Sequence, residues 1–210
     1  MTGLRSESTD TAGPPLLERM ALPLRTASPD AWLEAVHSDF DSFLQDHAAA
    51  EKKAAGMAIS MLSHYPDRPE LVEAMADLAV EEMSHYREVV KWIHQRGCFT
   101  AADRKDDYMN GLRGHCRRGS EAFMLDRLLI AAVIEARGAE RFALIAHSLP
   151  LSPLGTFYKA IARSEQRHYT LFLELASRYF PAGTQESRWS ALLDIEADIL
   201  RSLVPRAALH

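Results

Sequence analysis

Two segments of the sequence share one unusual feature, a glutamate and a histidine three residues apart on an apolar helical stripe. EEMSHY contains Glu82 and His85, and SEQRHY contains Glu165 and His168, each 83 positions later. Apolar residues at spacings of three, four and seven surround both pairs, which is typical of a helix face turned toward a core. A buried carboxylate is costly unless it is paired or bound to a metal. The fold must therefore bring both pairs to an interior that can hold them.

The spacing of apolar residues is helical almost throughout the chain after residue 28. Prolines and glycines separate the helical segments, and Ser28 followed by Pro29 is typical of a helix start. No alternating pattern long enough for a β-strand is present in the sequence. The pattern predicts helices over residues 28–64 with a bend near Ser38, 68–95, 120–147, 154–180 and 184–203.

The lengths of the connections predict how these helices are arranged. Short connections join the first two long helices and the next two, so each pair is expected to form an antiparallel hairpin. The segment FTAADRKDDYMNGLRGHCRRG, more than twenty residues long, links the hairpins. Two hairpins and one long crossover are the connectivity of the ferritin-like bundle, although other four-helix topologies remain open at this point. We expect an all-α, ferritin-like four-helix bundle with extra short helices at the termini.

Length and composition bound the class of protein. With 210 residues, 47% of them hydrophobic, the chain can bury a sizeable core. We expect residues 1–15, which lack periodic apolar spacing, to form a flexible lead-in, and residues 16–210 to form one domain. The net charge of −5 argues against a generally basic surface that coats nucleic acid.

The sequence also predicts a cytoplasmic location and no membrane contact. The amino-terminal segment is polar, and no apolar run reaches the roughly 18 residues that a spanning helix needs. The two cysteines form no CxxC pair, which is typical of a reducing compartment.

Two Glu-x-x-His pairs would need carboxylates from the other two long helices to complete a metal site. Glu51 lies 31 residues before Glu82, and Glu135 lies 30 residues before Glu165. Residues this far apart can lie at one level of an antiparallel hairpin with a short turn. Glu140 is the rival to Glu135, but it breaks the internal repeat, in which Glu51 and Glu135 are 84 positions apart.

Four carboxylates and two imidazoles are thus predicted at the centre of the bundle. A Glu from each of two helices and a Glu-x-x-His from each of the other two hold di-iron or di-manganese centres in such bundles. Mixed oxygen and nitrogen donors suit iron or manganese. A third Glu-x-x-His, Glu34 to His37, has no partner carboxylate and is interpreted as incidental. The predicted ligands are Glu51, Glu82, His85, Glu135, Glu165 and His168, with Tyr86 and Tyr169 just outside them or in the core.

Four longer segments carry a resemblance to a known family: HAAAEKKAAGMA, EEMSHYREVV, DRLLIAAVIEARGAERF and FYKAIARSEQRHY. With these segments, the sequence from about Leu17 to Phe180 resembles the tRNA 2-methylthio-N6-isopentenyladenosine hydroxylases, the MiaE family. The resemblance implies that the iron ligands are the same six residues. It further implies a di-iron monooxygenase that uses O2 and electrons from a reductase or ferredoxin-type donor. The implied reaction hydroxylates the isopentenyl group of a modified adenosine in the anticodon loop of tRNA.

The crossover carries a local basic cluster on an otherwise acidic chain. Phosphate contacts need such a cluster, and a splayed anticodon-loop base could then enter a pocket. Simple solvation of a long exposed loop explains the same residues equally well, so both interpretations stay open. The candidate tRNA contacts are Arg104, Lys105, Arg113, Arg117 and Arg118.

Two other classes of protein also remain open. A ferritin-like ferroxidase or peroxidase would use the same ligands without an organic substrate. The absence of paired CxxC motifs argues against a peroxidase of the rubrerythrin type. A non-enzymatic helical protein would use the glutamates only in buried ion pairs. Metal content distinguishes the non-enzymatic protein from the metal-dependent classes. The formation of an organic product distinguishes the hydroxylase from the ferroxidase or peroxidase.

Overall fold

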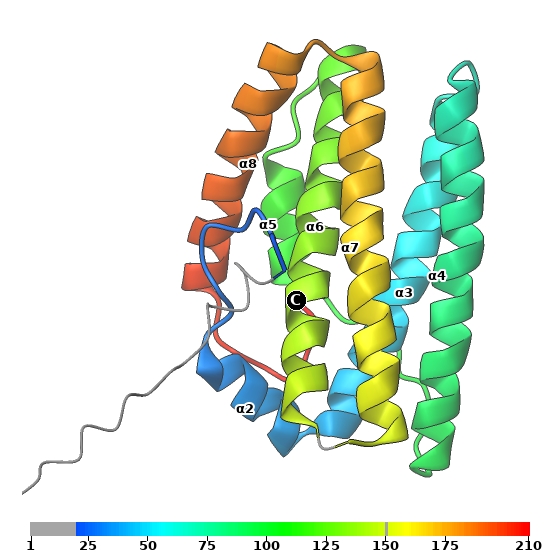
Figure 1. The fold of residues 1–210 in the computed structure, drawn as a ribbon, viewed down its shortest axis with the longest axis vertical. Coiled ribbons are helices and arrows are strands. Elements are labelled where there is room, and N and C mark those ends of the chain that lie inside the picture. The colour runs from blue at the N-terminus through cyan, green and yellow to red at the C-terminus, as the bar shows by residue number, and fades with distance from the viewer. Residues whose placement is uncertain (1–19, 150) are drawn as a thin grey trace, which may run out of the picture.

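The computed structural model describes residues 20–149 and 151–210, and all regular structure in these ranges is helical (Figure 1). The all-α class is therefore confirmed. The lead-in predicted over residues 1–15 lies outside the described residues. The four long helices of the bundle are α3 (Phe40–His64), α4 (Pro69–Gln95), α6 (Ser120–Ser148) and α7 (Pro153–Tyr179), and the remaining helices are α2 (Asp30–Ser38), α5 (Asp107–Gly114) and α8 (Ala182–Ser202).

The two predicted hairpins are present and the long crossover joins them. α3 packs along α4, and α6 packs along α7. The hairpins contact each other mainly between α4 and α7, whereas α3 and α6 border a cavity. α8 packs on α6 and contacts α5 and α7. α8 has 21 residues and corresponds to the helix predicted over residues 184–203.

The first predicted helix is in fact two helices with a break at Asp39. The Asp39 side chain accepts a hydrogen bond from the backbone N–H of Ser42 at 3.1 Å and so caps α3. The bend predicted near Ser38 is thus a full interruption. α2 begins after Pro29 and has no side-chain cap, so the cap predicted at Ser28 is wrong.

The crossover, for which no helix was predicted, contains α5. Asp106 caps this helix, because its side chain accepts a hydrogen bond from the backbone N–H of Met109 at 2.9 Å. Tyr108 and Leu112, one turn apart, are completely buried. α5 therefore binds the crossover to the body of the protein through a short apolar face, which packs partly on α8.

Two clusters of buried apolar side chains fill the bundle, and the boundary between them positions the site. Leu128 and Phe172 belong to one cluster, and Phe43 and Phe142 belong to the other. α3, α4 and α7 pass from one cluster to the other near their middles, and α6 does so between Ala139 and Phe142. Five of the six predicted metal ligands lie at this boundary, and Glu135 lies one turn away from it along α6, among residues of the first cluster.

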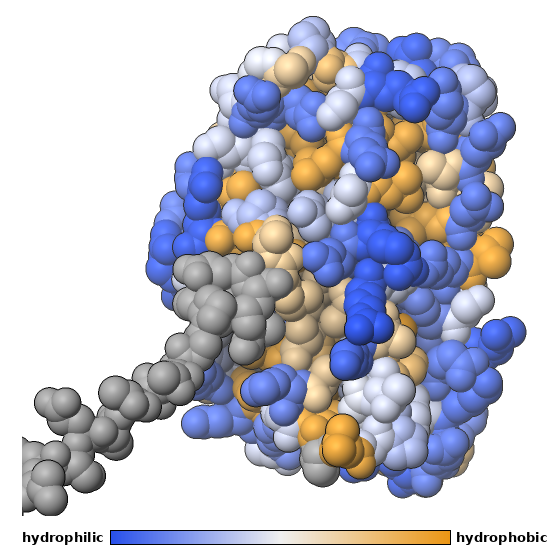
Figure 2. All heavy atoms as spheres, in the orientation of Figure 1, coloured by the Kyte–Doolittle hydropathy of each residue, from blue (hydrophilic) through white to orange (hydrophobic). Residues whose placement is uncertain are grey.

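The outer surface of the bundle is largely polar. α7 exposes Arg163 and Arg167, and Figure 2 shows hydrophilic residues following this helix down the molecule, with apolar side chains on either side. Among the described residues, no helix combines the length and the hydropathy that crossing a membrane requires.

Candidate metal centre

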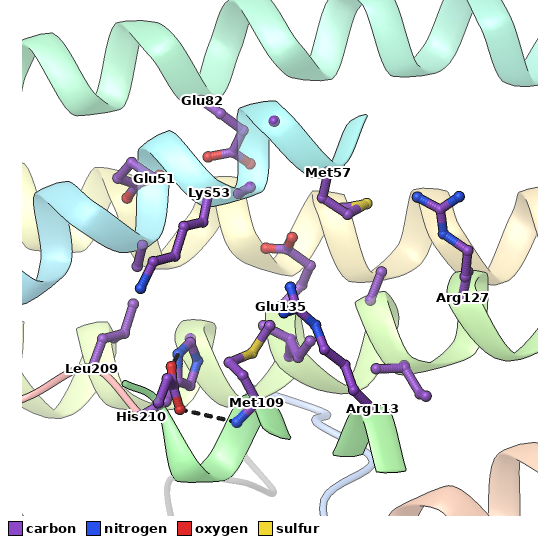
Figure 3. A pocket seen from close by; sticks show the side chains of 18 of the residues that line it. Glu51, Lys53, Met57, Glu82, Met109, Arg113, Arg127, Glu135, Leu209 and His210 are labelled. Atoms are coloured by element: carbon purple, nitrogen blue, oxygen red, sulfur yellow. Dashed lines mark hydrogen bonds and ion pairs between the residues drawn. The ribbon is translucent and has the colours of Figure 1, made fainter. Parts of the chain in front are cut away.

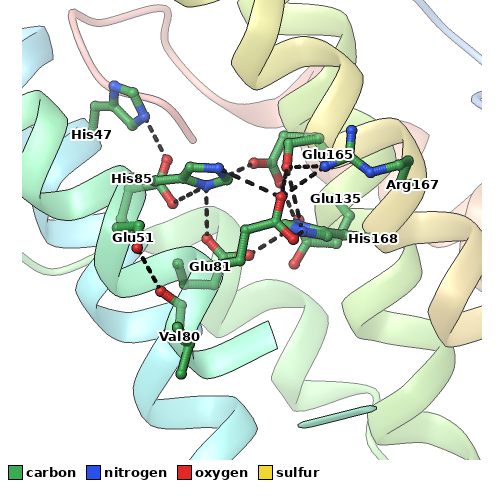
Figure 4. Close-up of polar contacts among 12 residues, drawn as sticks. His47, Glu51, Val80, Glu81, His85, Glu135, Glu165, Arg167 and His168 are labelled. Carbon is green, nitrogen blue, oxygen red and sulfur yellow. Dashed lines mark hydrogen bonds and ion pairs between the residues drawn. The ribbon is translucent and has the colours of Figure 1, made fainter. Parts of the chain in front are cut away.

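The six predicted ligands converge between the four long helices (Figure 4). They form two groups, and in each group the potential ligand atoms lie within 4.8 Å of one another. Both groups contain Glu82 and Glu165, so they describe two neighbouring cation positions that share two carboxylates. The first group also contains Glu51 and His85, and the second also contains Glu135 and His168.

Both imidazoles direct Nδ1 toward the carboxylates. The Nδ1 atom of His168 lies 2.9 Å from Oε1 of Glu82 and 3.6 Å from Oε2 of Glu165. The Nδ1 atom of His85 lies 3.4 Å from Oε2 of Glu82. The nitrogen that would bind a cation is therefore the same in both histidines.

Several polar atoms of the centre are buried and have no hydrogen-bond partner among the described residues. They are both carboxylate oxygens of Glu82, Oε1 of Glu165, and Nδ1 of His85 and His168. Buried polar atoms are normally satisfied, because an unpaired one is costly. Four carboxylates also outnumber two imidazoles, so negative charge remains even when both histidines are protonated. Oxygen and nitrogen donors with excess negative charge fit a pair of divalent cations such as iron or manganese.

Burial and neighbouring charges shift the pKa values of the groups in the centre. Burial raises the pKa of Glu51 and of Glu165 well above the ordinary value. Burial alone would lower the pKa of His85, but the neighbouring carboxylates of Glu51 and Glu82 outweigh it and raise that pKa to about 9. Carboxylate contacts likewise outweigh burial and raise the pKa of His168. Protons therefore occupy sites that a bound cation would take over.

His47 supports Glu51 from behind, a role that the sequence analysis did not assign. Its Nε2 lies 2.6 Å from Oε1 of Glu51, and the imidazole is completely buried. Burial lowers the pKa of His47 to about 3, so the ring is neutral near pH 7. A carboxylate oxygen accepts, so this contact places the ring proton on Nε2. The i, i+4 spacing of the two residues on one helix is the signal that could have revealed the contact.

Glu81, which precedes Glu82 on α4, lies half-buried behind both histidines (Figure 4). Its Oε2 is 3.2 Å from Nε2 of His168, and its Oε1 is 3.8 Å from Nε2 of His85. The Ser164 hydroxyl and the Arg167 guanidinium both donate to Oε1, the latter at 2.7 Å. Glu81 and Ser164 each precede one Glu-x-x-His pair, so the internal repeat could have indicated that they meet.

A cavity of about 690 Å³ opens beside the carboxylates, between α3 and α6 (Figure 3). Residues of α5 and residues 209–210 complete its wall. Apolar side chains such as Met57 and Ile134 line it together with Glu51 and Glu135. Its volume is that of a small-molecule pocket. An organic group in this cavity would lie next to the predicted ligands.

Of the five predicted tRNA contacts, only Arg113 lines the cavity. Arg117 is paired with a buried aspartate of α6 at 2.7 Å, and Lys105 is paired with a neighbouring aspartate at 3.1 Å. Arg104 and Arg118 are exposed on the crossover and do not line the cavity. The structure thus separates one member of the predicted basic cluster from the other four.

The other residues that the sequence analysis considered near the centre lie outside the two ligand groups. Tyr86 and Tyr169 pack against the two apolar clusters, and within the described ranges neither hydroxyl bonds to a predicted ligand. Glu140, the rival to Glu135, accepts a hydrogen bond from Arg137 at 2.5 Å and lies outside both ligand groups. Glu135 is therefore the glutamate of α6 that joins the cluster.

Comparison with known proteins gives consistent similarities. Residues 16–210 match the model of the family described as tRNA-(MS2IO6A)-hydroxylase (MiaE). A tRNA 2-(methylsulfanyl)-N(6)-isopentenyladenosine(37) hydroxylase of Pseudomonas putida is 38% identical over 152 residues, 72% of this chain and 74% of that protein. The hydroxylase of the same name from Salmonella typhimurium is 32% identical over 133 residues, 63% of this chain but only 48% of that protein.

A solved structure is similar over nearly the whole fold. It is described as Protein 43 with aldehyde deformylating oxygenase activity from Synechococcus. The TM-score is 0.84 at 33% sequence identity, and the match covers 89% of this chain and 94% of that one. The helical arrangement described above is thus shared with an oxygenase.

Proposed function

This chain belongs to the MiaE family of tRNA hydroxylases, and on that premise we propose that it hydroxylates the isopentenyl group of 2-methylthio-N6-isopentenyladenosine in tRNA. The observation that carries the proposal is the apolar cavity next to the carboxylate and histidine cluster. A ferroxidase that oxidises only iron needs no chamber for an organic group, whereas a hydroxylase does. The ferroxidase or peroxidase alternative is therefore less well supported than the hydroxylase.

One set of residues in this chain would bind the cations, and another set would position the substrate. Bound to the six predicted ligands, two iron ions would activate O2, so that one oxygen atom enters a C–H bond and the other becomes water with two electrons and two protons from outside. Oε2 of Glu81 lies 3.2 Å from Nε2 of His168 and would keep the ring proton on that nitrogen, which leaves Nδ1 free to bind a cation. Met57 and Ile134 would hold the isopentenyl group beside the centre and exclude water from it.

The reaction implies two partners and a location. The electrons must come from an external donor, which we propose to be a reductase or a ferredoxin-type protein. The macromolecular substrate would be the anticodon loop of tRNA, where an unstacked base can be presented to a pocket. A tRNA-modifying role is consistent with the predicted cytoplasmic location.

The test is mass spectrometry of nucleosides from a single reaction. Iron-loaded, reduced protein receives O2 and tRNA that bears the isopentenyl modification, with the Glu82→Ala variant as the control. One added oxygen atom on the modified nucleoside, absent with Glu82→Ala, is the expected result. An aliphatic aldehyde, the substrate class in the name of the Synechococcus protein, serves as a competing substrate. Bound iron without a hydroxylated nucleoside would overturn the proposal and favour the ferroxidase.

A further inference from the structure

Three cationic side chains line the cavity, and they come from three different helices. Lys53 belongs to α3, Arg113 to α5 and Arg127 to α6. Figure 3 shows Lys53 and Arg127 toward opposite ends of the cavity, with Arg113 reaching between them from α5. Cationic groups are thus distributed along the opening rather than gathered at one point.

These three cations have no carboxylate partner among the residues that the structure describes. The one polar contact recorded for them is the hydrogen bond from Arg127 to the Ser60 hydroxyl at 3.2 Å. Nearby cations differ, since Lys52 is paired with Asp103 at 2.8 Å and Arg117 is paired with a buried aspartate. On a chain with a net charge of −5, unpaired cations at one opening fit a ligand with several negative charges.

An aromatic ring lies at the same end of the cavity as Arg127. Phe123 lines the cavity and keeps 39% of its surface exposed, which is unusual for a phenylalanine. The Arg127 guanidinium lies over this ring, 5.8 Å from its centroid. Exposed aromatic rings and arginine planes are the surfaces on which proteins stack unpaired RNA bases.

We propose that Lys53, Arg113 and Arg127 bind the RNA phosphates on the two sides of the modified nucleotide, while Phe123 stacks a neighbouring base. A nucleotide whose base enters the cavity has a phosphate on its 5′ side and another on its 3′ side, which matches cations spread along the opening. This inference rests on the proposed function. It restricts the RNA contact to the rim of the cavity, of which the sequence analysis found only Arg113.

Binding to a synthetic anticodon stem-loop RNA that carries the modified adenosine tests the proposal without depending on turnover. The variants are Lys53→Gln, Arg113→Gln and Arg127→Gln. The matched controls are Lys159→Gln and Arg163→Gln, which remove exposed charges from α7. Each rim variant should bind about three- to tenfold more weakly, as expected for loss of one charged contact. Iron content and far-ultraviolet circular dichroism should match the parent.

The salt dependence of binding gives a second, independent readout. Each phosphate contact contributes roughly 0.7 to the slope of log affinity against log salt for a single strand. Each rim variant should lower the slope by about this amount, and the α7 controls should leave it unchanged. For the aromatic ring, Phe123→Leu should weaken binding about fivefold or more while Phe123→Tyr retains it.

The outcomes separate this proposal from the proposed function. Unchanged binding in the rim variants, or equal weakening in the α7 controls, would overturn the rim assignment even if the parent hydroxylates tRNA. Weaker binding and a lower slope in the rim variants alone would support it. That result would stand even if no hydroxylated nucleoside formed, in which case only the proposed reaction would fail.

Discussion

Two clusters of buried charge lie side by side along α6, and they are built in opposite ways. In the first, Arg137 pairs with Glu140 at 2.5 Å and with Glu196 at 2.8 Å. The Tyr108 hydroxyl donates to Glu196 at 3.1 Å, and Arg141 brings a second cation. Two arginines thus balance two glutamates, and no side-chain polar atom of these four residues is left buried without a partner in the described part of the chain.

The second cluster is the candidate metal centre, which begins at Glu135, two residues before Arg137. It contains four glutamates, two histidines and no arginine or lysine. Its unpaired atoms include both oxygens of Glu82 and the Nδ1 atoms of both histidines. Both clusters are equally buried, so the cost of burial alone does not distinguish them.

The difference lies in how the buried negative charge is compensated. Where protein cations balance it, the cluster joins α6 to α8 and to the segment around residue 28, and its role is structural. Where the protein supplies no arginine or lysine, the compensating positive charge must come from protons or from bound metal. We therefore propose that the arginine cluster serves stability and that the histidine cluster binds cations, and the predictions below test that division.

The largest effect is expected from removing Arg137. Arg137→Met leaves Glu140 and Glu196 buried without their main partner, which typically costs about 3–5 kcal/mol. For a chain of this size such a loss lowers the melting temperature by roughly 10 °C or more. Thermal and urea unfolding of the metal-free protein would measure it.

A second variant controls for simple loss of packing. Replacing one arginine and one glutamate together, with Arg137→Met and Glu196→Leu, should recover part of the lost stability, because Arg141 and Glu140 then remain as one buried cation and one buried anion. If this double variant were as unstable as Arg137→Met, unpaired charge would not be the cause of the loss.

The second prediction concerns Glu165. Glu165→Gln removes a shared ligand and should abolish the stabilisation by Fe(II) under anaerobic conditions. That stabilisation is about 2.7 kcal/mol when the metal is at a hundredfold excess over Kd, or roughly 5–10 °C. The metal-free variant should be more stable than the metal-free parent, since a raised carboxyl pKa reflects a cost of burial. Scanning fluorimetry with and without metal distinguishes these effects, and a metal shift as large as in the parent would contradict the assignment.

The contrast also shows what the sequence could predict. The apolar spacing and the prolines indicate the four long helices, and the internal repeat indicates the six ligands, because both signals are periodic along the chain. The partner of Arg137 is Glu196, 59 positions away, and no local pattern connects them. The internal repeat relates Glu81 to Ser164, but the burial of Glu81 depends on how closely α4 approaches α7, which periodicity does not determine. Lys53 and Arg127 line the same cavity only because α3 and α6 border it.

The third prediction tests whether Glu81 orients the histidines. Glu81→Gln keeps the shape of the side chain but removes the charge near Nε2 of His168. Losing such a contact behind a metal ligand typically lowers metal affinity about 10- to 100-fold. A titration with Co(II), followed by its absorption spectrum, measures affinity and coordination without turnover. Glu88→Gln, also on α4 but away from the centre, is the control; equal affinities in both variants would remove this role from Glu81.

The last prediction uses pH to compare the centre with and without metal. The pKa values of Glu51 and Glu165 are raised in the folded protein, and that of His85 rises from 6.5 to about 9. The folded state therefore binds these protons more tightly than the unfolded state does, so the stability of the metal-free protein should fall as pH rises from about 6.5 to about 9. Below about pH 6.5 the lowered pKa of buried His47 acts in the opposite direction.

Metal should reverse this trend, because a cation must displace the same protons and so binds more strongly at higher pH. We expect the free energy of unfolding of the metal-free protein to fall by about 1 kcal/mol between roughly pH 6 and pH 8. Over the same range the metal-loaded protein should become more stable relative to the metal-free protein. Urea unfolding at both pH values, with and without Fe(II), gives the four free energies needed. The arginine cluster contributes little to either slope, since the pKa of Arg141 is lowered only to about 10 and Arg137 stays charged. Parallel pH profiles in the two forms would mean that protons and metal do not compete for this centre.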